Sequence, residues 1–390
     1  TVFAGIACQS PGRAPRHMDI NSATFRNNVI QDYLDLIEFA NGDPESSSWA
    51  AVRRDMGHPE PFGLDMIGVG NENWGCGGNM TPDYYAHLYR RYQTYIRCYD
   101  KNAPIFKICG GANADDYEWT DVVLRECFRN PAPPEAHGFM DGLSVHYYAG
   151  VEKGIHKGSA TDFDEAVWFN TLARALYIEE VLTRHSAIMD TYDPEKKIGM
   201  MVDEWGCWHD VEPGTNPGFL YQQNTMRDAL TAGVSLNIFN KHCDRIKMAC
   251  IAQIVNVLQS VILTEGKKML LTPTYHVFHM YKHHQDAELV ESWLEGAGKI
   301  GLKEQEMVPD VQESVSVDKD GVLTITLNNL SPEEERQMEV VLTKKEPSRI
   351  EAKIVRGRMQ SYNTFEEPEQ VKEMFYQTVG HDILWKAVTK

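Results

Sequence analysis

One stretch of the chain joins a short apolar run to an acid and then to glycines: Met66-Ile-Gly-Val-Gly-Asn-Glu-Asn-Trp-Gly-Cys-Gly-Gly78. The opening Met-Ile-Gly-Val is typical of a buried strand. An acid at the point where such a strand leaves the core is partly desolvated, so we expect the pKa of Glu72 to be raised toward neutrality. A general acid that works near pH 7 needs such a pKa. The alternative is an ordinary loop with a solvated glutamate, but the adjacent aromatic Trp74 favours a sugar site.

The composition is that of a large globular protein. The chain has 390 residues, of which 42% are hydrophobic and 24% charged, enough for one large domain and a smaller one. Its 38 basic and 56 acidic residues give a formal net charge of −18, which argues against nucleic-acid and anionic-membrane partners and allows a neutral substrate. No apolar run reaches the roughly 18 residues of a membrane span, so we expect no segment that crosses a membrane.

The cysteines and the first residue bear on localisation. The eight cysteines are scattered and form no Cys-x-x-Cys pair. Several lie in apolar segments, which indicates buried reduced thiols and slightly favours the cytoplasm. Because the chain begins at Thr1, without an initiator methionine or a signal peptide, we expect the true N-terminus to lie upstream, and the localisation stays unknown.

Apolar runs and amphipathic segments alternate along most of the chain. Strands that alternate with helices imply a parallel sheet covered by helices. The predicted fold class is therefore α/β, with a (β/α)8 barrel over residues 1–287 whose active site lies at the carboxyl ends of the strands. We expect strands at 2–7, 64–70, 105–109, 142–148, 198–204 and 235–239, and helices at 29–39, 81–99, 119–128, 165–189 and 221–232.

The pattern changes from about residue 288. Residues 315–327 alternate between apolar and polar on both sides of Asp320-Gly321, which is typical of a hairpin with a tight turn. Residues 339–342 and 350–355 continue as strands. We therefore expect residues 288–390 to form a C-terminal β-sandwich domain.

A second stretch, residues 198–208, repeats the pattern of the first: an apolar strand, then Glu204, then a tryptophan. Two strands of one parallel barrel that each end in this way bring two carboxylates to one rim. Glycoside hydrolysis needs such a pair, one group to protonate the leaving oxygen and one to attack the anomeric carbon. A separation of about 5 Å would imply retention of configuration. Asp203 is a rival acid, but strand alternation puts it on the opposite face, and we interpret it as a structural partner.

Other polar residues lie where they could assist. His146 and Tyr148 end the strand between the two glutamates and are suited to hold a carboxylate and a sugar hydroxyl, although His146 could also be an ordinary core histidine. Gln253 interrupts an apolar run, and a buried glutamine must find partners, of which a sugar hydroxyl is one. Four histidines on an aromatic-rich helix lack carboxylate or thiolate company, so we predict no metal and no cofactor. They are His276, His279, His283 and His284.

Five segments resemble the α-L-arabinofuranosidases of glycoside hydrolase family 51, and the resemblance covers nearly the whole chain. It implies a (β/α)8 barrel with a β-sandwich, and an enzyme that removes terminal non-reducing α-L-arabinofuranosyl residues from arabinoxylan or arabinan by double displacement with retention. The segments are Gly70-Asn-Glu-Asn-Trp74, Ser144-Val-His-Tyr-Tyr148, Val202-Asp-Glu-Trp205, residues 241–256 and Asn363-Thr-Phe365.

The resemblance also implies roles for single residues. Glu72 would be the acid/base after strand four, and Glu204 the nucleophile after strand seven. Asn71, Tyr148 and Gln253 would bind the arabinose, and Trp208 would shape the pocket. The predicted substrate-binding residues are Asn71, Trp74, His146, Tyr148, Trp208 and Gln253.

The start of the chain departs from the family pattern. If residues 64–70 form strand four, three β/α units, or about 90 residues, should precede them. Only 63 residues do so, and the family's Arg-(Trp/Tyr)-Pro-Gly-Gly segment is not among them. We therefore expect the chain to lack the first part of the barrel, and to associate into a homo-oligomer through the edges left open.

Two other functions remain open at this stage. An endo-glucanase of similar design is the nearest enzymatic alternative. A truncated protein that binds sugar weakly, or folds only with a partner, is the non-enzymatic one. The two intact glutamates favour an enzyme, and the missing strands favour the truncated protein.

Overall fold

The computed structural model describes residues 2–4, 23, 27, 30–100, 104–129, 139–150, 157–303, 306–342, 347–376 and 384–387. The chain divides into two compact units. Unit 1 comprises Thr1–His146, Val181–Asp203 and Arg245–Met248. Unit 2 comprises Tyr147–Glu180, Glu204–Asp244 and Ala249–Lys390. The domain boundary expected between residues 287 and 288 stays a prediction.

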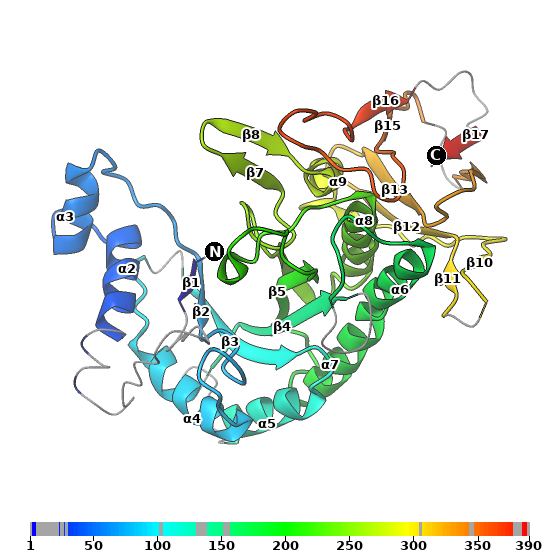
Figure 1. Ribbon diagram of the computed structural model, residues 1–390. Coiled ribbons are helices and arrows are strands. Elements are labelled where there is room, and N and C mark those ends of the chain that lie inside the picture. The colour runs from blue at the N-terminus through cyan, green and yellow to red at the C-terminus, as the bar shows by residue number, and fades with distance from the viewer. Residues whose placement is uncertain are drawn as a thin grey trace. The chain divides into compact units, whose positions relative to one another are not determined.

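Six strands form one sheet in the order β1-β2-β3-β4-β5-β6 (Figure 1). Neighbours in the sheet are also neighbours along the sequence, as in a (β/α)8 barrel. β1 pairs with β2, β2 with β3 and β3 with β4, all in parallel. The sheet is part of a barrel, which confirms the predicted fold class. Its strands are β1 (Val2–Ala4), β2 (Met66–Val69), β3 (Phe106–Asn113), β4 (Gly142–Ala149), β5 (Gly199–Cys207) and β6 (Ile246–Ile251).

The first strand is only partly described. β1 covers Val2–Ala4, whereas the rest of the strand expected at 2–7 lies outside the described residues. The helix expected at 29–39 is seen as α2 (Gln31–Asn41), and it ends where Asn41-Gly42 predicts. Ile37 of α2 packs with Ile67 of β2 in the core of unit 1.

Two helices run along the outer side of β2 and β3 (Figure 1): α4 (Pro82–Tyr92), followed by a 3₁₀ turn (Gln93–Tyr95), and α5 (Tyr117–Cys127). Tyr85 of α4 is fully buried, and its hydroxyl donates a hydrogen bond to the Val69 carbonyl and accepts one from the Gly110 amide. This phenol therefore ties β2 to β3.

Helix α8 (Met226–Lys241) corrects one sequence prediction. The strand expected at 235–239 lies inside this helix, and the last strand of the sheet is β6. Almost every α8 side chain from Met226 to Phe239 is buried. A helix buried on all sides shows no polar face, so a short window of it cannot be distinguished from a buried strand.

The segment expected as one helix at 165–189 forms two. They are α6 (Glu165–Leu176) and α7 (Ile178–Tyr192), with Tyr177 between them. The described part of the chain contains no helix long and apolar enough to cross a membrane.

The C-terminal part of unit 2 is rich in antiparallel strands. The predicted hairpin is confirmed: β12 (Val311–Val317) pairs with β13 (Leu323–Asn329), and Gly321 in the turn has a φ of +79°. β9 (Glu288–Leu289) joins the other edge of β12. The two-stranded pairs are β7 (Ile262–Glu265) with β8 (Lys268–Leu271), β10 (Lys299–Ile300) with β11 (Val308–Pro309), β14 (Arg336–Glu339) with β17 (Leu384–Ala387), and β15 (Ala352–Ile354) with β16 (Met374–Tyr376).

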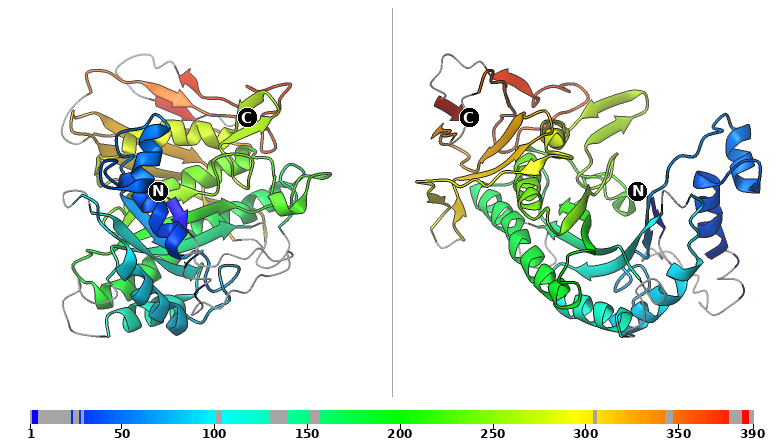
Figure 2. Two further views of the ribbon diagram at one scale, coloured as in Figure 1. Left: turned by 90° about the vertical axis from the view of Figure 1, so that its left-hand side faces the viewer. Right: turned by 180° about the vertical axis from the view of Figure 1, so that it is seen from behind.

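Polar side chains join α8 to the sheet that contains β12, and Figure 2 shows the orange strands of that sheet close to the helix. Asn237 donates a hydrogen bond to Gln312 at 3.0 Å, and Lys241 forms an ion pair with Glu313 at 2.8 Å. Helix α9 (Pro273–Tyr281), which a 3₁₀ turn (Lys282–His284) follows, packs beside α8 through the Tyr281 hydroxyl on the Gly233 carbonyl.

A buried arginine holds α2 against α3 (Ser48–Asp55). The Arg53 side chain is fully buried, and its guanidinium donates hydrogen bonds to five backbone carbonyls of the described residues. Some of these carbonyls end α2 and have no partner inside the helix. The acceptors are the carbonyls of Phe39, Ala40, Gly42, His58 and Pro59.

We therefore expect Arg53→Met to loosen this helix pair by about 3 kcal/mol, because methionine keeps part of the apolar volume and leaves buried carbonyls without donors. Amide hydrogen exchange across α2 and α3 measures this. The control is Arg54→Met, which removes only exposed ion pairs to Glu45 and Asp55 and should change stability by less than about 0.5 kcal/mol. Equal exchange in the two variants would contradict the role given to Arg53.

Candidate active site

The loop after β2 places Glu72 through a tight backbone turn. Glu72 has a φ of +44°, and its carbonyl accepts hydrogen bonds from the amides of Gly75 at 2.8 Å and Gly77 at 3.0 Å. A Cβ at position 77 would lie 1.7 Å from the Asn71 carbonyl oxygen, so only glycine fits there. The glycines that follow the acid are thus what allows the chain to fold back over it.

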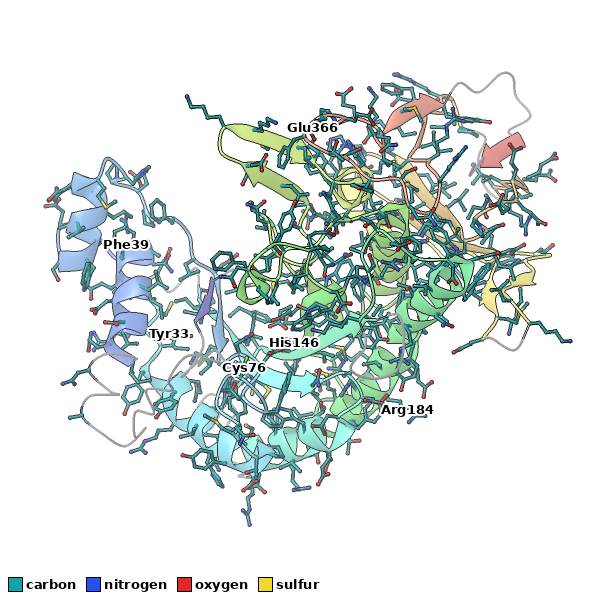
Figure 3. All side chains as sticks on the ribbon, in the orientation of Figure 1. Tyr33, Phe39, Cys76, His146, Arg184 and Glu366 are labelled. Atoms are coloured by element: carbon teal, nitrogen blue, oxygen red, sulfur yellow. The ribbon has the colours of Figure 1, made fainter. Side chains whose placement is uncertain are left out.

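Both oxygens of the Glu72 carboxylate have a neighbour. Oε1 lies 3.1 Å from Nδ1 of His146, and Oε2 accepts a hydrogen bond from the Cys76 thiol at 3.2 Å. Figure 3 labels Cys76 and His146, which lie close together. One partner comes from the end of β4 and the other from the loop of Glu72 itself, so the carboxylate is held from two directions.

The pKa of Glu72 corrects the sequence prediction. Burial raises it, as expected, but the hydrogen bond and the positive charge of His146, together with the Cys76 thiol, hold the pKa of Glu72 below its ordinary value. Hydrogen bonds to the charged form favour that form. The predicted shift toward neutrality was therefore wrong in sign, because it counted only desolvation.

His146 is itself held from behind. Its Nε2 lies 3.2 Å from Oδ1 of Asp203, and the same oxygen accepts a hydrogen bond from the Ser144 hydroxyl at 2.8 Å. All three side chains are buried. Asp203 therefore supports the His146 ring, and His146 is more than a core histidine because its other nitrogen faces the Glu72 carboxylate. The placement of Asp203 on the face opposite Glu204 stays a prediction.

Two more predicted residues lie around Glu72 in unit 1. The Trp74 indole donates a hydrogen bond to the Gly111 carbonyl at 3.2 Å, and its ring stands edge-on to His146 at 6.5 Å. Trp74 and Asn71 are both partly exposed. Both can therefore offer a surface to a bound molecule.

Three other predicted residues come together in unit 2. The Tyr148 hydroxyl donates a hydrogen bond to Oε1 of Glu204 at 2.6 Å. The rings of Tyr148 and Trp208 meet edge-to-face at 4.9 Å, and the Lys157 ammonium lies 3.6 Å from the centre of the Trp208 ring. Glu204, Tyr148 and Trp208 are each partly exposed, so this carboxylate has a phenol donor and an aromatic wall beside it.

Comparison with known proteins assigns the family. Residues 1–162 match the family description "Alpha-L-arabinofuranosidase 1 domain", and residues 203–382 match "Alpha-L-arabinofuranosidase C-terminal domain". The crystal structure of the GH51 arabinofuranosidase from Xanthomonas axonopodis pv. citri is 42% identical, with a TM-score of 0.82 over 89% of this chain and 68% of that chain. The chain belongs to glycoside hydrolase family 51.

Two further relatives extend the comparison. An intracellular exo-alpha-L-arabinofuranosidase of Bacteroides ovatus is 44% identical over 90% of this chain, which spans 66% of that protein's length. The alpha-L-arabinofuranosidase from Thermotoga maritima, solved as an arabinose complex, is 24% identical with a TM-score of 0.71 over 92% of this chain and 71% of that one. At that identity the second comparison shows the shared fold.

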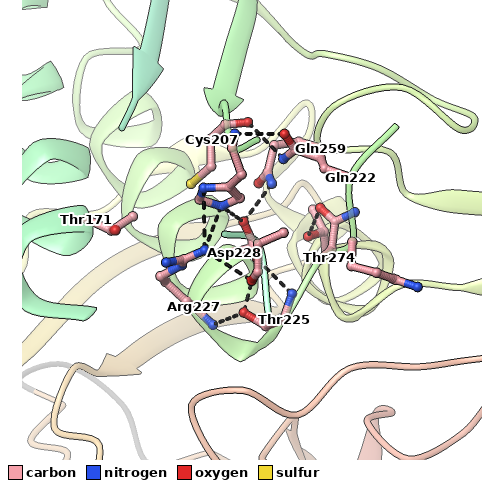
Figure 4. A network of polar contacts seen from close by, with 12 residues as sticks. Thr171, Cys207, Gln222, Thr225, Arg227, Asp228, Gln259 and Thr274 are labelled. Carbon is pink, nitrogen blue, oxygen red and sulfur yellow. Dashed lines mark hydrogen bonds and ion pairs between the residues drawn. The ribbon is translucent and has the colours of Figure 1, made fainter. Parts of the chain in front are cut away.

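In this family 51 chain, a buried polar network (Figure 4) fixes the backbone on both sides of Trp208, because Gln222 accepts a hydrogen bond from the His209 amide at 2.8 Å and donates one to the Cys207 carbonyl at 3.2 Å. His209 Nε2 lies 2.8 Å from Oδ1 of Asp228, which also accepts a hydrogen bond from Gln259 at 2.7 Å. Arg227 packs beside them, with Nη2 3.0 Å from His209 Nε2. The sequence analysis missed this network, although the spacing of Thr225 and Asp228 at the start of α8 is a recognisable helix-capping signal.

The same network bears on metal binding. One ligand atom from each of Cys207, His209 and Asp228 lies within 4.8 Å of the others. The Arg227 guanidinium already supplies a positive charge at this place. Burial and that charge hold the pKa of His209 below its ordinary value, although the Asp228 carboxylate acts to raise it. Because the charges of Arg227 and Asp228 balance each other here, we interpret the cluster as structural and not as a cation site.

The histidines of α9 need a correction. His279 does have a carboxylate neighbour, because its Nδ1 lies 2.7 Å from Oε2 of Glu373. Two lysines share the group: Lys353 lies 2.6 Å from the same carboxylate, and Lys282 lies 3.1 Å from His279 Nε2. His279 and Glu373 are thus part of a charged cluster with two lysines.

Gln253 is placed differently from the prediction. Its side chain is exposed, not buried, in the segment that follows β6. The buried glutamine of this region is Gln259, which contacts Asp228. An apolar run does not show which of its residues turn outward once the strand has ended. The exposed amide of Gln253 is available to a ligand.

Proposed function

We propose that this family 51 chain carries the catalytic residues of a retaining exo-α-L-arabinofuranosidase, which removes terminal non-reducing α-L-arabinofuranosyl residues. The observation that carries the proposal is that both predicted catalytic glutamates are partly exposed and each is held by a hydrogen-bonding side chain. The Bacteroides ovatus relative, named as an exo-alpha-L-arabinofuranosidase, supports the choice of substrate.

Glu204 is proposed as the nucleophile. Its carboxylate attacks the anomeric carbon and forms a covalent arabinosyl ester, while the bond to the leaving oxygen breaks. The Tyr148 hydroxyl, 2.6 Å from Oε1, fixes the orientation of the carboxylate before the attack. Trp208, held by the network behind it, limits where the sugar ring can lie.

Glu72 is proposed as the acid/base. It protonates the leaving oxygen in the first step, and in the second step it takes a proton from the water that cleaves the ester. His146, 3.1 Å away and backed by Asp203, is placed to share that proton.

The remaining predicted contacts complete the proposal. Asn71 and Gln253 offer amides to sugar hydroxyls, and Trp74 offers an aromatic face, each being at least partly exposed. The proposed substrate is an arabinofuranosyl-containing oligosaccharide or polysaccharide, and the net charge of −18 disfavours nucleic acid and anionic membranes. A homo-oligomer and a cytoplasmic location are further parts of the proposal.

Hydrolysis of nitrophenyl α-L-arabinofuranoside and of nitrophenyl β-cellobioside by the 390-residue chain tests the function. We expect release from the arabinofuranoside alone, with the α-anomer as the first product seen by proton NMR. Release from the cellobioside would instead support an endo-glucanase. If a cooperatively unfolding chain acts on neither, the proposal is wrong for this chain.

A further inference from the structure

Cys76 contacts the proposed acid/base, and no role has been assigned to it. The loop geometry enforces the contact: the Glu72 carbonyl binds the amides of Gly75 and Gly77, and this turn brings the side chain four residues later back onto the Glu72 carboxylate. Cys76 is only partly exposed.

The two partners of Glu72 differ in kind. His146 at Oε1 is a nitrogen donor that carries positive charge when protonated, and Asp203 supports it from behind. Cys76 at Oε2 is a neutral thiol, a weak donor and a weak acceptor. Burial, His146 and Cys76 are the influences that set the pKa of Glu72.

An acid/base must hold its proton in one step and release it in the next. A strong fixed donor at Oε2 would stabilise the carboxylate and oppose reprotonation. A thiol can donate to the carboxylate and then rotate to accept a hydrogen bond from the protonated acid, so it orients the group in both states. Its bond to the charged carboxylate is the stronger of the two.

We propose that Cys76 is a positioning residue for the acid/base, which fixes the Glu72 carboxyl group through Oε2 in both of its protonation states. The inference rests on the proposed role of Glu72. It assigns a function to the cysteine of the Trp-Gly-Cys-Gly-Gly segment, whose presence in the sequence indicated only a reduced thiol.

The kinetic test compares Cys76→Ala, Cys76→Ser and the control Cys98→Ala, which removes an exposed thiol bonded to the Asp100 carbonyl. For an alkyl arabinofuranoside, which needs protonation, Cys76→Ala should lower kcat/KM about threefold to tenfold. It should also move the basic limb of the pH profile up by about half a unit, because a donor to the charged form is lost. Cys76→Ser keeps a hydroxyl donor, so it should restore most of the kcat/KM and most of the original pH profile. Cys98→Ala should behave like the unaltered chain in both measurements.

The nitrophenyl arabinofuranoside, whose leaving group needs little protonation, should lose less than about twofold in Cys76→Ala. Equal losses on both substrates with an unmoved pH profile would overturn the proposal and leave Cys76 a structural residue.

A second readout does not depend on activity. Carboxyl carbons of labelled glutamate are titrated by NMR, and the Glu72 signal is the one that Glu72→Gln removes. Cys76→Ala should raise the pKa of Glu72, and an unchanged pKa would overturn the proposal. If the chain hydrolyses no arabinofuranoside but this pKa rises, the proposed function fails while the positioning contact stands.

Discussion

Replacing Glu204 by alanine is expected to lower turnover of aryl arabinofuranosides by about 10⁴-fold or more, the order of loss seen when a catalytic nucleophile is removed. The carboxylate is partly exposed and held by the Tyr148 hydroxyl, and its loss leaves no group to form the covalent intermediate. Initial rates at saturating substrate measure the effect. The matched control is Asp210→Ala, which removes an exposed carboxylate six residues later and should keep full activity.

Added azide should restore product formation in Glu204→Ala. A small anion can occupy the space of the missing carboxylate and attack the anomeric carbon once, so the product should be an arabinosyl azide of inverted configuration. Proton NMR of the product decides the anomer. A Glu204→Ala chain that remains fully active, or one whose azide product retains configuration, would end the assignment of Glu204 as nucleophile.

Glu72→Ala is expected to separate substrates by their leaving groups. For alkyl or sugar leaving groups, kcat/KM should fall by about 10²–10⁴-fold, the usual contribution of general acid catalysis. Nitrophenolate leaves without protonation, so the formation of the intermediate should be slowed far less. The basic limb of the pH profile should also disappear, since it reports the loss of the Glu72 proton.

Two features of the structure sharpen this test. Because His146 and Cys76 hold the pKa of Glu72 below its ordinary value, the acid form is lost at a lower pH than desolvation alone would give. The control is Glu60→Ala, which removes an exposed carboxylate of unit 1 and should leave both substrates unaffected. Equal losses on good and poor leaving groups would mean that Glu72 does not act as the acid.

The sequence by itself determined the features that depend on neighbours along the chain. The apolar run before Glu72 predicted β2, and the same pattern before Glu204 predicted β5. Asp320-Gly321 between two alternating segments predicted the β12–β13 hairpin. These signals are local, because strand alternation, turn residues and helix stops act over a few residues.

Only the tertiary structure decided the features that depend on residues far apart in the sequence. Burial raises the pKa of Glu72, and the contact with His146, 74 positions later in the sequence, lowers it again. No local sequence pattern reveals that contact. Residues 235–239 belong to a helix whose side chains are almost all buried, and such a helix lacks the solvent-exposed polar face that marks a helix in a sequence. Local charge, burial and packing depend on which side chains the fold brings together. The exposure of Gln253 and the contact between the Cys76 thiol and the Glu72 carboxylate are therefore visible only in the folded chain.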